Sequence, residues 1–166
     1  MKVRNYLRLL LLGSLTINIV IGCASSPAKD QAACNIVTVP ASYKVYLYMS
    51  KEHNPNQQIM EALEGNSSYA LLQLDQDVKI VSDLQSVGTE GLLLTIDIIG
   101  NMQGGVSKRI DIRYELTNVS TKELLLRGKD ALSSKLGYNK ITIKMGKNIA
   151  RNVTEFLNCI KKRGSS

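Results

Sequence analysis

Residues 109–116 read RIDIRYEL, a strict alternation of apolar or aromatic side chains with charged ones. In an extended chain the apolar and aromatic side chains point to one side and the charged ones to the other. The first side carries Ile110, Ile112, Tyr114 and Leu116, and the second carries Asp111, Arg113 and Glu115. An alternation of period two predicts a β-strand with one buried and one solvated face, which is typical of an antiparallel sheet.

The neighbouring segments extend this strand into a sheet. Residues 92–99, LLLTIDII, predict a strand before it, and residues 101–105 predict the turn or loop between the two. After a turn at 118–122, a third strand starts at 123–128 and extends toward Ser133. Earlier in the chain, residues 44–49, KVYLYM, predict a first strand, and residues 78–81, VKIV, predict a short one.

Two helices are expected between and after these strands. Asn54-Pro55 offers a cap and a first-turn proline, after which Ile59, Met60 and Leu63 share one face. The polar run at 65–68, GNSS, interrupts this helix, which resumes at 69–74. Residues 141–162 form a long amphipathic helix, with apolar side chains at Met145, Ile149, Val153, Phe156 or Leu157, and Ile160. The order of elements predicts an α+β fold, a two-layer sandwich whose largely antiparallel sheet is covered by the long C-terminal helix.

The first residues resemble a targeting signal. Three basic side chains precede an uncharged run over residues 9–21, which is too short for an ordinary membrane span and reads as a secretory signal. Val20-Ile21-Gly22-Cys23 resembles the bacterial lipobox. The resemblance implies that residues 1–22 are a signal peptide and that Cys23 carries diacylglycerol on its thiol and a fatty acid such as palmitate on its amine. Two alternatives remain open: an ordinary signal peptide with a chance cysteine, and an uncleaved anchor helix.

The rest of the chain has room for one domain. Residues 24–35 are small and polar and predict a flexible tether. The chain therefore divides into a lipidated tether at residues 23–42, a single α+β domain at residues 43–162 and a tail at residues 163–166. Removal of residues 1–22 leaves 18 basic and 14 acidic side chains, a formal net charge of +4. This mild charge, without a basic stripe interleaved with aromatics, argues against nucleic-acid binding.

Two cysteines remain once Cys23 is assigned to lipid. Cys34 and Cys159 are an even pair in an oxidising compartment, and we expect them to form a disulfide that clips the N-terminal segment to the last helix. The alternative is a pair of free thiols.

The sequence nominates no catalytic set, cofactor site or metal site. His53 is the single histidine, and no second histidine or cysteine cluster accompanies it. Two pairs of acids stand close in sequence, Asp75 with Asp77 and Asp111 with Glu115, and Arg113 is expected to hold the second pair ionised. Neither environment suits a carboxylate that must act as an acid, so we expect a protein that is not an enzyme.

A family resemblance accompanies this pattern. The run at 90–96, EGLLLTI, followed by strands at 108–116 and 122–127 and a closing helix, resembles small periplasmic lipoproteins with a fold like the amino-terminal domain of TolB and like CsgG. The resemblance implies a non-catalytic assembly or accessory factor that binds an envelope protein partner. Because Ala24 rather than aspartate follows Cys23, the family rule places it on the outer membrane, facing the periplasm. The alternative is a lipid- or glycolipid-binding auxiliary of an envelope transport system, and the least favoured reading is a periplasmic hydrolase.

Overall fold

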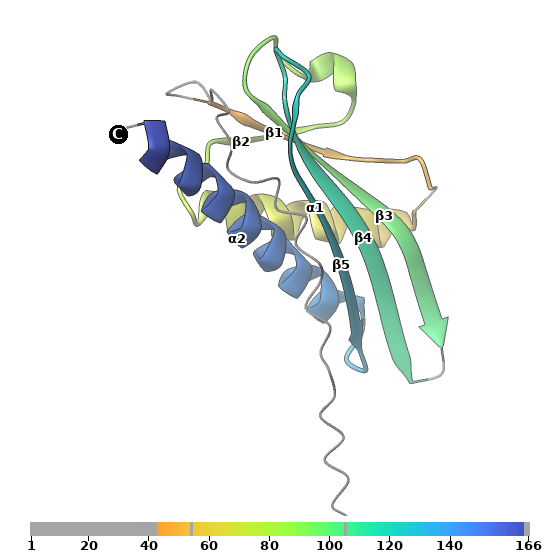
Figure 1. Cartoon of the computed structure of the whole chain (residues 1–166). Coiled ribbons are helices and arrows are strands. Elements are labelled where there is room, and N and C mark those ends of the chain that lie inside the picture. Colours follow the sequence, from red (N-terminus) through yellow and green to blue (C-terminus); the bar gives the residue numbers. More distant parts are fainter. Residues whose placement is uncertain (1–42, 54, 105, 165–166) are drawn as a thin grey trace, which may run out of the picture.

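The computed structural model describes residues 43–53, 55–104 and 106–164 (Figure 1). Its elements are β1 (Val45–Met49), α1 (Gln57–Leu72), β2 (Val78–Val81), a short 3₁₀ helix η1 (Leu84–Ser86), β3 (Leu92–Gly104), β4 (Ser107–Asn118), β5 (Leu124–Ser134) and α2 (Tyr138–Gly164). This order confirms the predicted succession of strand, helix, short strand, meander and long helix. Cys23, Cys34 and the tether lie outside the described residues.

The strands form one five-stranded sheet in the order β2-β1-β3-β4-β5. β1 runs parallel to both of its neighbours, with Val45 opposite Val78 on one side and Leu92 on the other. β3, β4 and β5 pair antiparallel as a meander. The α+β class is therefore confirmed. The sheet is mixed rather than purely antiparallel, because α1 connects β1 to β2 as a crossover that leaves these two strands parallel.

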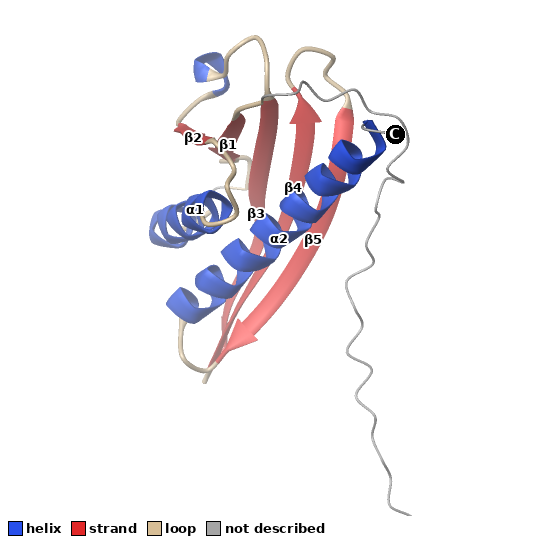
Figure 2. Ribbon diagram, turned by 90° about the vertical axis from the view of Figure 1, so that its left-hand side faces the viewer, coloured by secondary structure: helices blue, strands red, loops and turns tan. Residues whose placement is uncertain are grey.

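Both helices lie on one face of the sheet (Figure 2). α1 packs on β1 and β2, α2 crosses β4 and β5, and the two helices contact each other. The core between the layers is mostly aliphatic. Its fully buried side chains include Leu47, Leu63, Leu71, Leu94, Ile96, Ile110, Ile112, Leu116, Ile141 and Met145. Among the described residues, neither helix has an apolar stretch long enough to cross a membrane.

The predicted interruption of the first helix is wrong, since α1 continues through Gly65–Ser68 without a break. Asn66 and Ser67, in the middle of this run, lie against α2. Asn66 donates a hydrogen bond of 3.1 Å from Nδ2 to Thr142 Oγ1, and Ser67 is completely buried. The helix also begins later than predicted, because Asn56 supplies the cap by accepting from the Ile59 amide at 3.3 Å.

The predicted turn at 101–105 is also placed too early. β3 continues to Gly104, and its extension pairs with residues 107–111 of β4, beyond a register shift between Ile98 and Gly100. The pairing overrides the weak strand propensity of Asn101, Gln103 and Gly104, because the ladder satisfies backbone groups whatever their side chains. The first two strands of the meander, β3 and β4, thus form a long hairpin whose end carries exposed Met102 and Val106.

Candidate functional site

The sheet face opposite the helices carries a row of polar and charged side chains. Along each strand the side chains alternate with the buried core positions, so one set points away from α1 and α2. We call this surface the helix-free face and define it by Tyr46, Tyr48, Thr95, Asp97, Arg113, Glu115 and Arg127. Apart from Asp97, these side chains are partly or fully exposed.

Asp97 is the central residue of this face and the one buried carboxylate on it. Its side chain is only 4% exposed. His53 Nδ1 lies 3.0 Å from Asp97 Oδ2 and 3.1 Å from Oδ1, and Arg113 Nη2 donates to Oδ2 at 3.0 Å. Because a carboxylate only accepts, His53 donates through Nδ1 and leaves Nε2 as its second ring nitrogen. A buried charge is tolerated when it is paired and hydrogen-bonded in this way.

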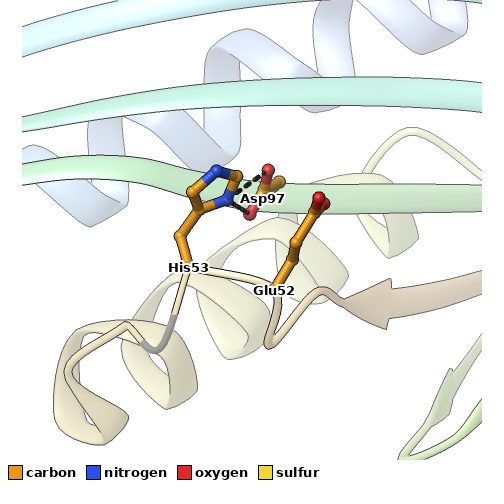
Figure 3. Close-up of side chains that lie close together, drawn as sticks. All are labelled: Glu52, His53 and Asp97. Atoms are coloured by element: carbon orange, nitrogen blue, oxygen red, sulfur yellow. Dashed lines mark hydrogen bonds and ion pairs between the residues drawn. The ribbon is translucent and has the colours of Figure 1, made fainter.

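Glu52 completes the cluster from the same loop as His53 (Figure 3). Its Oε2 lies 3.7 Å from Arg113 Nη2, and its side chain is 68% exposed. Arg113 therefore stands between two carboxylates, one buried in the sheet and one at the surface. Glu52, His53 and Asp97 offer ligand atoms that all lie within 4.8 Å of one another. They are the one group of histidine, cysteine and acidic side chains among the described residues whose ligand atoms lie this close together.

Local structure explains how the loop reaches the sheet. The Ser50 amide donates to the Ile96 carbonyl at 2.8 Å, which continues the β1–β3 ladder one residue past the end of β1. The Glu52 amide then donates to Ser50 Oγ at 3.2 Å and turns the chain over the helix-free face. Asp97 and Arg113 are direct cross-strand partners in the β3–β4 register. Opposite charges at such a position stabilise the pairing of the strands.

Two further ion pairs lie on the meander, and they correct the predicted role of Arg113. Glu115 pairs with Arg127 at 2.9 Å, and Asp111 pairs with Arg109 at 2.8 Å. Arg113 contacts neither acid, because the register places it opposite Asp97 instead. The hydrogen bond from Arg109 to Asp111, together with the negative charge of that carboxylate, raises the pKa of Arg109.

The other residues singled out in the sequence lie apart from this cluster. Asp75 and Asp77 are exposed in the predicted turn before β2, where Asp77 lies 3.6 Å from Lys44 Nζ. Cys159 is half-buried on α2. Since Cys34 is outside the described residues, its disulfide with Cys159 stays a prediction, as does lipidation of Cys23.

The sequence analysis identified His53 as a residue to consider. It did not predict that Asp97 and Arg113 would join His53 in one cluster. The prediction of a solitary histidine rested on the absence of a second histidine or cysteine nearby. Asp97 is 44 positions away along the chain from His53. The one available signal was a charged residue inside the apolar strand LLLTIDII, because a carboxylate there needs a partner from elsewhere in the fold.

Comparison with known proteins gives a fold and no family. No family model and no curated protein matches the sequence. Two solved dodecamers of PelC from Paraburkholderia phytofirmans match with TM-scores of 0.56 and 0.54, at 12% and 13% identity, and each match covers 68% of this chain and 90% of PelC. Lipoprotein GNA1162 from Neisseria meningitidis matches with a TM-score of 0.43 at 11% identity, over 69% of this chain and 99% of that one. The PelC matches establish a shared fold, whereas the GNA1162 match is too distant to support an argument.

Proposed function

We propose that this chain is a non-catalytic lipoprotein of the bacterial cell envelope, anchored through lipid on Cys23, and that it serves as an assembly or accessory factor through protein–protein contacts. The observation that carries the proposal is the one-sided packing of the helices. α1 and α2 cover one face of the sheet, and within the part of the chain that the structure describes no helix covers the helix-free face (Figure 2). A second protein is the partner that such a face fits.

The side chains of the helix-free face suit a protein partner. Tyr46 and Tyr48 are both half-buried on β1, and tyrosine combines apolar area with a hydroxyl that hydrogen-bonds across an interface. Charged side chains surround them, including the pair formed by Glu115 and Arg127. These charges give a partner a specific electrostatic pattern to match.

The solved structures that share the fold support an assembly role. PelC, the protein with the higher TM-scores, was solved as a dodecamer, so a domain of this shape is compatible with extensive protein–protein contacts. The lipobox-like sequence that ends at Cys23 supports a location in the cell envelope. The absence of aspartate after that cysteine favours the outer membrane, facing the periplasm.

The packing of α2 bears on the alternative of a lipid carrier. Ile141, Met145, Ile149 and Val153 are buried between α2 and the sheet, in the space that an acyl chain would occupy. Lipid binding there requires α2 to move away from the sheet. The compact interior therefore favours the protein partner over the lipid.

Membrane attachment is tested first, with Cys23→Ser in the full chain. We expect the wild-type protein in the outer-membrane fraction of a density gradient, resistant to carbonate washing. The variant should lose that attachment. If the variant stays in the membrane after the wash, the lipoprotein part of the proposal is wrong.

The partner surface is tested with a photo-crosslinking amino acid in living cells. Tyr48 on the helix-free face is replaced by p-benzoylphenylalanine, and Tyr69, which is 65% exposed on α1, provides the matched control. We expect one dominant crosslinked protein from position 48 and none from position 69. The reverse result would move the partner to the helical layer, and the absence of any crosslink from position 48 would contradict the proposal.

A further inference from the structure

We propose that Glu52, His53 and Asp97 form a binding site for Zn²⁺, and that Arg113 positions Asp97 to receive the ion. The site goes beyond the proposed protein–protein function and does not depend on it. Its three donors come from the β1–α1 loop and from β3, two parts of the chain that meet only in the folded domain (Figure 3).

The distance between the two inner donors fits one shared ion. His53 Nδ1 and Asp97 Oδ1 are 3.1 Å apart. Two ligands of one zinc ion, each about 2.0–2.2 Å from it, stand roughly 3–3.5 Å apart at angles near tetrahedral. An ion there would replace the proton that His53 now donates.

Arg113 leaves one oxygen of Asp97 available. Its Nη2 donates to Oδ2 at 3.0 Å, whereas His53 is the one donor to Oδ1 among the residues that the structure describes. A second-shell cation on one carboxylate oxygen fixes the orientation of the other, as partners of metal-binding carboxylates commonly do. The guanidinium balances one of the two carboxylate charges, so the cluster with neutral His53 keeps a net charge of −1 that a cation can compensate.

Glu52 is the third ligand and the adaptable one. Its side chain is 68% exposed on a loop, so a rotation is enough to bring an oxygen from the observed separation to a bond. His53 is 43% exposed, which leaves the fourth tetrahedral position open to water. One imidazole with two carboxylates is a mixed nitrogen and oxygen set that suits Zn²⁺, whereas Mg²⁺ and Ca²⁺ prefer oxygen alone.

Binding would tie the β1–α1 loop to the centre of the sheet. Because the donors are assembled only by folding, ion binding should stabilise the folded domain. The bound ion is thus expected to have a structural role beside the helix-free face. Its binding can therefore be measured through the thermal stability of the domain as well as by titration.

The test uses the full chain, extracted from membranes in detergent, carrying no histidine tag and with its thiols alkylated beforehand. Zn²⁺ alone is titrated by calorimetry while the imidazole C–H resonances are followed by NMR. Since the protein has one histidine, these resonances report this site and no other. We expect one ion per chain, a shift of the imidazole resonances and a rise in Tm.

Three variants give the comparison. His53→Ala and Glu52→Gln should each weaken binding by tenfold or more and remove the rise in Tm. Glu123→Gln, an exposed acid in the β4–β5 turn, should bind as the wild type does. Tm values in EDTA establish that each variant is folded. Imidazole resonances that do not move at saturating Zn²⁺, or unchanged affinity in His53→Ala, would overturn the proposal.

Discussion

The hydroxyl of Tyr114 accepts a hydrogen bond of 2.7 Å from Nδ2 of Asn152, and this bond joins the middle of β4 to the middle of α2. The ring is 96% buried and lies against Gly128, where any Cβ would overlap it. Burial raises the pKa of Tyr114 above its ordinary value, so the phenol is neutral at physiological pH. The pair fixes how the long helix sits on the meander.

Tyr114→Phe should lower the free energy of unfolding by about 1 kcal/mol, because it removes the hydroxyl and leaves the ring in place. Chemical denaturation with an unchanged m-value measures the effect. Tyr69→Phe on the exposed side of α1 is the control and should change stability by less than about 0.5 kcal/mol. Equal effects of the two substitutions would mean that the hydrogen bond adds nothing.

Gly146→Ala should destabilise the domain by about 1–3 kcal/mol, because α2 has no space for a methyl group there. A Cβ on Gly146 would lie 2.7 Å from the carbonyl carbon of Asn66 and 2.9 Å from the Ser67 amide nitrogen. Backbone cannot rotate away as a side chain can. Thermal unfolding of the variant is the measurement.

Gly65→Ala is the matched opposite in α1. A Cβ there would have no neighbour within 4 Å, and alanine is the better helix former. We expect an increase of about 0.5–1 kcal/mol in the free energy of unfolding. A loss of stability at this position would show that helix α1 is not continuous through residues 65–68.

Lys122→Gly should stabilise the β4–β5 turn. Lys122 has a φ of 61°, a left-handed conformation that costs a side chain of its kind free energy, whereas glycine adopts it readily. Asn118 holds the turn by accepting from the amides of Ser120 and Thr121. We expect a gain of about 0.5–1 kcal/mol in urea denaturation, and a loss for Gly137→Ala, where φ is 94°.

Glu64→Gln should raise stability at neutral pH but not in acid. Burial, and then the negative charge of Glu61, raise the pKa of Glu64. A carboxyl whose pKa is higher in the folded state supports folding most when protonated, and that support is lost as the pH rises through the folded value. The wild type should therefore have the lower Tm at pH 7, and the difference should disappear below the unfolded pKa.

The predicted disulfide gives a further test. If Cys34 and Cys159 are bridged, the wild type should run faster on a non-reducing gel than after reduction, and Cys159→Ser should remove the difference. A bridge that closes so long a loop contributes up to about 4–5 kcal/mol in the chain-entropy model. The same mobility for both proteins without reductant would contradict the bridge.

The period-two pattern at 109–116 predicted the meander because local alternation reports which face is buried. The apolar spacing over residues 141–162 predicted α2 for the same reason. The parallel placement of β1 between β2 and β3 was not predictable in this way, since its neighbours are fixed by the crossover through α1 and not by its own side chains. Gly65–Ser68 was read as a break because the sequence shows small polar residues but not the helix that packs on them.

The candidate site was less accessible to sequence reasoning than the fold. Periodicity identifies faces, but the cluster depends on register, which places Asp97 opposite Arg113, and on the turn after Ser50, which brings His53 over the sheet. From the sequence alone, a histidine in a polar loop is expected to be solvated. Its contact with the sheet becomes visible only when the position of the loop in the fold is known. The buried charge in β3 was the single local sign that a partner was required.

The position of β1 between β2 and β3 has a consequence for the order in which the chain is made. β1 is complete at Met49, yet its inner neighbour begins only at Leu92. A chain that emerges from its N-terminus exposes one edge of this apolar strand until more than forty further residues have followed. During that interval VYLYM is open to pairing with any other strand. A chaperone that holds extended apolar segments would therefore bind this domain first at β1, and the pairing of β3 with β1 would end that contact.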